Sequence, residues 1–240
     1  MFPRRNLPRL PLEVHLAELR RRLLVFLAFL FGLWVLLFLL FSHLVPFFLW
    51  PYRRAMGKFT VHMVFTTLPE AVMAALKSTF FMALALTLPL LLYQAWAYLS
   101  PGLFPHERRL GRRLLALSFF LMLAGGLAGY FLFLPILLHF FLSFGYAHFQ
   151  ANLRLQNYLS FMAKTLLVSV LLAEIPLLVA LLTRTKIISR RVLTRRWWKI
   201  LGGLYLIALF LTPGDFLSQL LLLFTLYLFL ELGFLLARFL

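Results

Sequence analysis

The residue that stands out chemically is a single carboxylate, Glu107, in the segment 101–113. This segment lies between two long apolar stretches and also contains four arginines. Clusters of Lys and Arg beside apolar stretches are typical of the cytoplasmic loops of membrane proteins, so the arginines need no further explanation. The lone carboxylate does need one. It either neutralises its own neighbours or binds a cation that comes from outside the chain, and the pattern leaves both alternatives open.

The other acidic residues are few, because the chain has only seven Asp and Glu among 240 residues. Glu18 lies one helical turn before Arg22, so an i,i+4 surface pair worth a few tenths of a kcal/mol is the simple interpretation. Glu70 and Asp215 lie at expected helix starts, where the helix dipole favours an acid. Capping alone is enough to explain these last two residues.

Two more acids, Glu174 and Glu231, fall inside apolar stretches. An ionisable group within a membrane is costly, so it usually faces a wet cavity and marks function. Glu231 lies near the end of its stretch, within reach of the interface. Glu174 lies deeper, and we expect it to be a functional intramembrane polar residue. Lys164 is ten residues earlier on the same expected helix, which is about 15 Å along the axis and too far for direct pairing.

The composition is that of an integral membrane protein. The chain is 63% hydrophobic and 13% charged, whereas a soluble domain is roughly half apolar and a quarter charged. A net charge of +17 raises nucleic acid as a partner, but the charge lies in short segments between apolar stretches, so membrane topology explains it and no nucleic acid is expected.

The chemistry-bearing residue types argue against an enzyme. The chain has no cysteine, which excludes a disulfide framework and a thiolate nucleophile. His106 and Glu107 are not followed by the second histidine of an HExxH zinc motif, and there is no GxSxG motif. The six histidines are scattered. We therefore expect no catalytic residue, no metal and no cofactor.

Hydrophobic periodicity predicts an all-α integral membrane protein with one domain, residues 1–240. The six expected transmembrane helices are approximately 23–45, 70–99, 114–138, 158–183, 198–212 and 217–236. The fifth and sixth are expected to be short, because about fifteen helical residues reach roughly 22 Å and the hydrocarbon core is about 30 Å thick. We expect the bilayer to be thinner beside them.

Prolines and glycines predict where the helices bend or pack. Pro46 and Pro51 are expected to end the first helix, and the aromatic residues around them suit a cap formed by the outer loops at the membrane interface. Pro89 is expected to kink the second helix. A cluster of small residues in the third helix predicts close helix packing. These residues are Gly125, Gly126 and Gly129.

The distribution of basic residues predicts the orientation. Of the 24 Lys and Arg, 18 lie in the segments expected on the inner side and four lie in the outer loops. This asymmetry predicts that both termini are cytoplasmic. The first apolar stretch is too long for a cleaved signal and no transit peptide is evident, so we expect a multi-pass protein of a bacterial or archaeal cytoplasmic membrane.

Several motifs, taken in their order and spacing, resemble TatC, the large multispanning subunit of the twin-arginine protein translocase. The resemblance runs from about residue 12 to 238. It is carried by His15-Leu-Ala-Glu18-Leu-Arg20-Arg-Arg-Leu23, by Tyr93-Gln94-Ala-Trp96, by Pro101-Gly-Leu with His106-Glu107-Arg108-Arg109, by Gly126, Tyr130-Phe131 and Pro135, by Glu174-Ile-Pro176, and by Thr212-Pro-Gly-Asp215 with Ser218-Gln219 and Glu231.

The resemblance implies a core subunit that binds the Arg-Arg signal peptides of folded precursor proteins. By correspondence of positions, the signal-peptide site is expected at Glu18, Glu107, Tyr98 and Arg20. Glu174 corresponds to the family's intramembrane carboxylate. Single-span partners of the TatA/TatB type are expected near the last two helices, at Thr212, Asp215 and Gln219. Transport driven by the proton-motive force and a homo-oligomer within a larger complex are also implied.

An ion-coupled small-solute transporter that uses Glu174 as proton carrier is the alternative from another functional class. The few intramembrane charges permit it. No inverted repeat or pair of broken helices is visible in 240 residues, which disfavours it. The sequence does not tell which cargo is exported, how many copies assemble, which organism the chain comes from, or whether a separate TatB exists.

Overall fold

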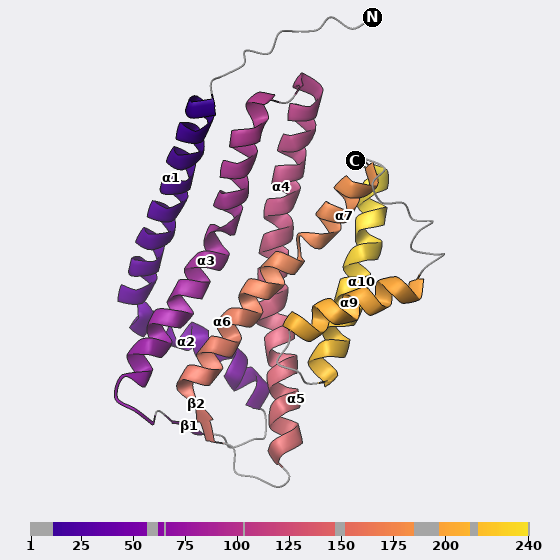
Figure 1. Cartoon of the computed structure of the whole chain (residues 1–240). Coiled ribbons are helices and arrows are strands. Elements are labelled where there is room, and N and C mark those ends of the chain that lie inside the picture. The colour runs from indigo at the N-terminus through magenta and orange to yellow at the C-terminus, as the bar shows by residue number, and fades with distance from the viewer. Residues whose placement is uncertain are drawn as a thin grey trace, which may run out of the picture.

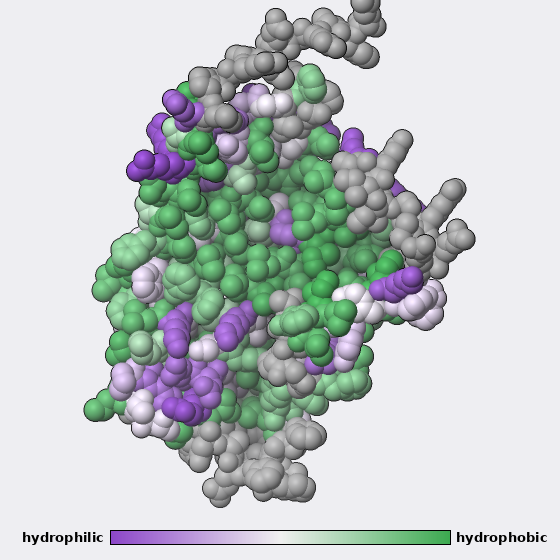
Figure 2. All heavy atoms as spheres, viewed as in Figure 1, coloured by the Kyte–Doolittle hydropathy of each residue, from purple (hydrophilic) through white to green (hydrophobic). Residues whose placement is uncertain are grey.

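The computed structural model describes residues 12–56, 62–64, 66–102, 104–146, 152–184, 197–211 and 216–239. Within these ranges the protein is almost entirely helical. Five segments are long and apolar enough to cross a membrane: Glu13–Leu39, Glu70–Gly102, Arg108–Ser143, Leu155–Arg184 and Ser218–Arg238. Figure 2 shows a broad hydrophobic belt across the face in view, with hydrophilic side chains gathered above and below it. The all-α membrane class is confirmed, whereas six crossings and their orientation stay predictions.

The bundle has two ends that differ in construction (Figure 1). One end, called the cap end below, carries α2 (Phe41–Met56) and the short strands β1 (His62–Val64) and β2 (Asn152–Arg154). The opposite end, called the turn end, holds the start of α1 (Leu12–Leu39) and the 3-10 turn η1 (Ser100–Gly102). All candidate functional residues are located relative to these two ends.

The prolines of α2 do not end a helix, which corrects the expectation that Pro46 and Pro51 would do so. α1 ends earlier, at Leu39, and both prolines lie inside α2. Pro51 has no N–H, so the carbonyl of Phe47 loses its helical donor. The hydroxyl of Tyr130 donates to that carbonyl at 2.7 Å instead. A donor from a distant helix therefore replaces the bond that the proline removes.

An ion pair with a buried carboxylate stabilises the cap end, together with a strand pair that the sequence did not predict. β1 and β2 pair in parallel, with Met63 opposite Leu153. Glu70 begins α3 (Glu70–Leu99), and its Oε2 accepts hydrogen bonds from the Thr66 N–H (2.8 Å), the Thr66 hydroxyl (2.9 Å) and Arg154 Nη2 (3.2 Å). Glu70 thus joins the two loops at the cap end. Its role extends beyond the helix start that the sequence suggested.

α3 is central and packs against α1 and α6 (Leu155–Leu172). Its contact face is made of small residues that are completely buried, including Ala74, Ser78, Ala83 and Thr87. The hydroxyls among them donate to carbonyls of the preceding turn of α3. These hydroxyl groups are therefore hydrogen-bonded although they lie in the apolar interior. α3 continues through Pro89; the predicted kink is not tested.

The third membrane segment is one continuous helical run, as expected, but with a π-helical turn inside it. α4 (Pro105–Ala128) leads through η2 (Gly129–Phe133) into α5 (Leu134–Tyr146). The glycines before the turn let α4 approach α6. A Cβ placed on Gly125 would lie 2.7 Å from the carbonyl oxygen of Ser169, and one on Gly129 would lie 2.7 Å from Ser169 Cβ. The predicted packing role of these glycines is confirmed.

The fourth expected helix is interrupted, which corrects the prediction of one helix over 158–183. α6 ends at Leu172 and α7 (Ile175–Arg184) begins after a two-residue break at Ala173 and Glu174. Pro176 is the second residue of α7, where a missing N–H is tolerated. The proline cannot donate to Leu172, so the α6 ladder stops there. The break leaves Glu174 at the junction of the two helices.

The last two helices differ in length, so the expectation that both are short is half correct. α9 (Trp197–Leu211) has 15 residues and α10 (Phe216–Phe239) has 24. At 1.5 Å per residue α10 is about 36 Å long, enough to cross the hydrocarbon core. Figure 1 shows α9 lying across α10, and α10 ending at the turn end, where α1 begins. Gly233 permits close contact of α10 with α7.

Candidate functional site

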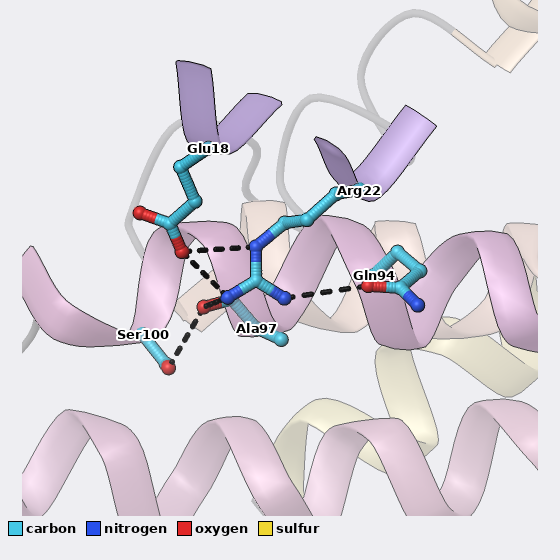
Figure 3. A network of polar contacts seen from close by, with 5 residues as sticks. All are labelled: Glu18, Arg22, Gln94, Ala97 and Ser100. Atoms are coloured by element: carbon cyan, nitrogen blue, oxygen red, sulfur yellow. Dashed lines mark hydrogen bonds and ion pairs between the residues drawn. The ribbon is translucent and has the colours of Figure 1, made fainter. Parts of the chain in front are cut away.

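Arg22 organises the turn end by joining α1 to α3 (Figure 3). Its Nε and Nη2 donate to Glu18 Oε1 at 3.0 and 2.6 Å. Nη1 donates to Gln94 Oε1 at 3.3 Å, and Nη2 also donates to the Ala97 carbonyl at 3.2 Å. The planar guanidinium suits this arrangement because its donors point in fixed directions. Glu18 is therefore held at a defined place relative to α3.

Glu18 keeps half of its carboxylate available. Both bonds from Arg22 end on Oε1, and no described residue donates to Oε2. The Glu18 side chain is 30% exposed and that of Arg22 is 26% exposed. An i,i+4 pair of this kind contributes only a few tenths of a kcal/mol by itself. The i,i+4 pairing expected from the sequence is present, but it leaves an acceptor oxygen within reach of a visiting donor.

Tyr98 and Arg20 lie near this carboxylate in different ways. The Tyr98 ring, near the end of α3, contacts His15 of α1 with ring centroids 5.1 Å apart and planes at 36°. This is a second contact between the two helices, one turn before Glu18. Arg20 is exposed on α1 and makes no described contact with the pair. The structure brings Glu18 and Tyr98 to the same end.

Glu107 belongs to the first turn of α4, beside the η1 turn. Its side chain lies outside the described residues, so the separation of the two expected carboxylates is not established. The arginines that follow it on α4 are exposed: Arg108, Arg109, Arg112 and Arg113. The exposed arginines that follow Glu107 therefore lie at this end, and the role of Glu107 itself stays a prediction.

Glu174, the predicted intramembrane acid, lies at the α6–α7 break. Its Oε1 is buried and has no hydrogen-bond partner among the described residues. Ser118 of α4 lies beside this carboxylate, but its buried hydroxyl oxygen does not meet hydrogen-bond geometry either. Two adjacent unsatisfied polar groups in an apolar interior are costly. An unsatisfied buried carboxylate is often functional, and the functional role of Glu174 stays a prediction.

The expected partner site near the last two helices is only partly described. Thr212 and Asp215 lie outside the described residues. Gln219 is buried on α10, and its Oε1 accepts a hydrogen bond from the Tyr205 hydroxyl of α9 at 3.1 Å. Gln219 therefore joins α9 to α10. Glu231 lies farther along α10, beside Trp197 and Tyr227 at a pocket between these helices.

Sequence reasoning missed three members of the turn-end cluster. Arg22 was considered only as a surface partner of Glu18. Gln94 and His15 were quoted as parts of motifs and were given no role. The available signal was that His15 and Arg22 flank Glu18 in the first motif, and that Gln94 lies one helical turn before Tyr98. Among the described residues, no group of three or more His, Cys, Asp and Glu is placed to hold a metal ion.

Comparison with known proteins identifies the family. A family model described as Sec-independent protein translocase protein (TatC) matches residues 14–224. The TatC of Deinococcus radiodurans is 32% identical over 231 residues, covering 95% of this chain and 86% of that protein. The TatC of Escherichia coli strain K12 is 30% identical over 229 residues, covering 95% and 88%.

The fold agrees with this assignment. A crystal structure of the twin-arginine translocase receptor TatC superposes with a TM-score of 0.78 at 24% identity, covering 94% of this chain and 98% of that chain. The sequence matches extend over almost the whole chain, across the motifs that carry the candidate residues. The chain therefore belongs to the TatC family of Sec-independent protein translocase proteins, and it is a multi-pass bacterial membrane protein of protein transport.

Proposed function

We propose that this chain is the subunit of a twin-arginine translocase that binds Arg-Arg signal peptides, and that Glu18 and Glu107 receive the two guanidinium groups. The observation that carries the proposal is the state of Glu18. One oxygen is held by Arg22 and the other is unoccupied among the described residues. Tyr98 and Arg20 belong to the same site in this proposal.

The geometry of Arg22 supports a receptor for guanidinium. Arg22 is a guanidinium already bound to Glu18, so the carboxylate is demonstrably compatible with this kind of partner. Bonds to Gln94 and the Ala97 carbonyl hold Arg22 in place. A visiting arginine can therefore bind Oε2 while Arg22 stays where it is. Arg22 then acts as a positioning residue that fixes the direction of Glu18.

Electrostatics explains why such a site needs carboxylates. The turn end is strongly basic, with exposed arginines on α1 and α4. A signal with two positive charges is repelled by this surface unless an acid offsets the repulsion. Arginine pairs with a carboxylate through two parallel hydrogen bonds, whereas lysine presents a single point charge. The site is therefore expected to prefer Arg-Arg over Lys-Lys.

The remaining parts of the proposal concern the partners and the energy source. Single-span TatA/TatB-type subunits bind near Thr212, Asp215 and Gln219, and transport uses the proton-motive force. The chain crosses the membrane six times with both termini in the cytoplasm, as part of a larger complex with further copies of itself. The start of α1 and the end of α10 lie at the same end of the bundle, which supports termini on one side of the membrane.

Site-directed crosslinking of an Arg-Arg signal peptide to the membrane-embedded chain tests the site. We expect Glu18→Ala and Glu107→Ala each to lower the yield at least about tenfold, since each removes a charge-assisted hydrogen-bond pair. Glu13→Ala is the matched control, because Glu13 is an exposed acid in the first turn of the same helix. Undiminished crosslinking in both site variants, with normal membrane levels of protein, would disprove the assignment.

A further inference from the structure

A groove on the membrane side of α6 contains a lysine that the proposed function does not use. It is lined by residues of η2, α5, α6 and α10 and has a volume of about 300 Å³. Lys164 of α6 lies at its edge and is exposed. The two ion pairs among the described residues are Glu18–Arg22 and Glu70–Arg154, so Lys164 has no carboxylate partner there.

Polar and apolar groups are separated along this groove. Thr165 follows Lys164, and among the described residues nothing accepts its hydroxyl hydrogen. Farther along, the hydroxyls of Ser169 and Thr225 already donate to the carbonyls of Thr165 and Leu221, each at 2.8 Å. The rest of the deeper part is aliphatic: Val168, Leu172, Leu221 and Leu222. Free donors therefore gather near Lys164, and most of the remaining lining is apolar, apart from the Ser218 hydroxyl of α10.

Lys164 lies a few ångströms inside the expected hydrocarbon core, close enough for its side chain to reach the lipid head groups. Lys164 is nine residues from the start of α6 at the cap end, which is about 13 Å along the helix. The whole segment Leu155–Arg184 has 30 residues, about 45 Å, so it extends beyond a hydrocarbon core of about 30 Å on both sides. The flexible lysine side chain can extend its ammonium group to the head-group layer.

The dimensions favour a lipid over a protein helix. The lining residues of α6 run from Phe161 to Leu172, about 16 Å. A helix with its side chains is about 10 Å across, so a space of about 300 Å³ takes in only part of one helical face over that length. A single acyl chain is much thinner than a helix.

We propose that this groove binds one anionic phospholipid, with the phosphate at Lys164 and Thr165 and an acyl chain along the aliphatic part toward Leu172 and Leu222. The ammonium group pairs with the phosphate, and the chain fills the space between α6 and α10. The occupant is a membrane lipid, so the site is separate from the signal-peptide site at the turn end.

Native mass spectrometry of the full purified chain, titrated with phosphatidylglycerol, tests this proposal. We expect Lys164→Gln to weaken retention of one lipid at least about tenfold, because a charge-assisted hydrogen bond is lost. Lys164→Arg is expected to retain the lipid. Lys77→Gln is the matched control, since Lys77 is exposed on α3 seven residues from its start at the cap end and does not line the groove.

A second measurement locates the lipid. Phosphatidylglycerol with a photoreactive acyl chain is expected to label peptides containing residues 161–172 or 218–225, and diacylglycerol, which lacks the phosphate, is expected to label them much less. Unchanged retention by Lys164→Gln, an equal loss in Lys77→Gln, or labels that map elsewhere would overturn the proposal. Preferential labelling of the groove by an acidic helical peptide, with no competition from lipid, would assign it to a protein partner instead.

Discussion

The two ends of the bundle each contain one carboxylate–guanidinium pair, and the two pairs are built differently. Glu18 and Arg22 are neighbours on α1, both are partly exposed, and one carboxylate oxygen stays open. Glu70 and Arg154 are 84 residues apart, and the Glu70 side chain is completely buried. The first pair leaves room for a visitor. The second pair holds two loops together. The same chemistry therefore serves cohesion at one end and, in our proposal, binding at the other.

The largest effect on stability is expected from Arg154→Ala at the cap end. The variant leaves the Glu70 carboxylate buried with Thr66 as its only described partner, and an unpaired buried charge is strongly destabilising. We expect the thermal unfolding temperature of the purified protein in detergent to fall by several degrees.

The matched control for this prediction is Glu70→Gln. It removes the buried charge and leaves Arg154, which is 47% exposed and can be solvated, so its loss should be smaller. Adding Glu70→Gln to Arg154→Ala should restore part of the lost stability. If Arg154→Ala unfolds at the same temperature as the unmodified protein, the Glu70–Arg154 pair does not stabilise the cap end. The contrast between the two ends then disappears.

A smaller loss of stability is expected from Tyr130→Phe, also at the cap end. It leaves the Phe47 carbonyl, which Pro51 deprives of a helical donor, without the Tyr130 hydroxyl. An unsatisfied carbonyl costs about 1–3 kcal/mol, measured as the change in the free energy of unfolding. Pro51→Ala restores the N–H, so Tyr130→Phe should cost less in that background. Equal costs in both backgrounds would show that the hydroxyl does not replace the missing donor.

The smallest effect on stability is expected from Arg22→Ala at the turn end. The partly exposed i,i+4 pair contributes below about 1 kcal/mol, and the bonds to Gln94 and the Ala97 carbonyl are lost with it. The unfolding temperature should therefore fall less than in Arg154→Ala, which leaves a buried carboxylate unpaired. Crosslinking of an Arg-Arg signal should still fall, though less than in Glu18→Ala, because Glu18 loses the group that orients it. A large loss of stability would show that the Arg22 contacts at the turn end also stabilise the fold.

Several elements of the fold were predictable because their signal is local. Five apolar segments were recognised from the residues within each segment, and Gly125 and Gly129 from their spacing. The expectations that failed involve partners elsewhere in the chain. Pro46 and Pro51 look like helix ends in isolation, yet α2 contains them, and the interruption at Glu174 divides a stretch whose apolar pattern is continuous.

The candidate site shows the same division. Glu18 was predicted from its motif and Tyr98 from its corresponding position in the family, and the structure finds them at one end of the bundle. The bonds from Arg22 to Gln94 and the Ala97 carbonyl were not predicted, because 72 and 75 residues separate the partners. Periodicity tells which face of α1 a residue occupies. It does not tell which part of α3 lies opposite that face.

By itself, the sequence determined the membrane class, the positions of the apolar segments and the family, because each depends on residue types along short stretches. Only the tertiary structure decided which hydroxyl replaces a proline's donor, that Glu70 is closed off by Arg154, and that Glu18 keeps an oxygen open. The physical reason is that a buried polar group must find a partner in space, and that partner is set by how distant helices pack.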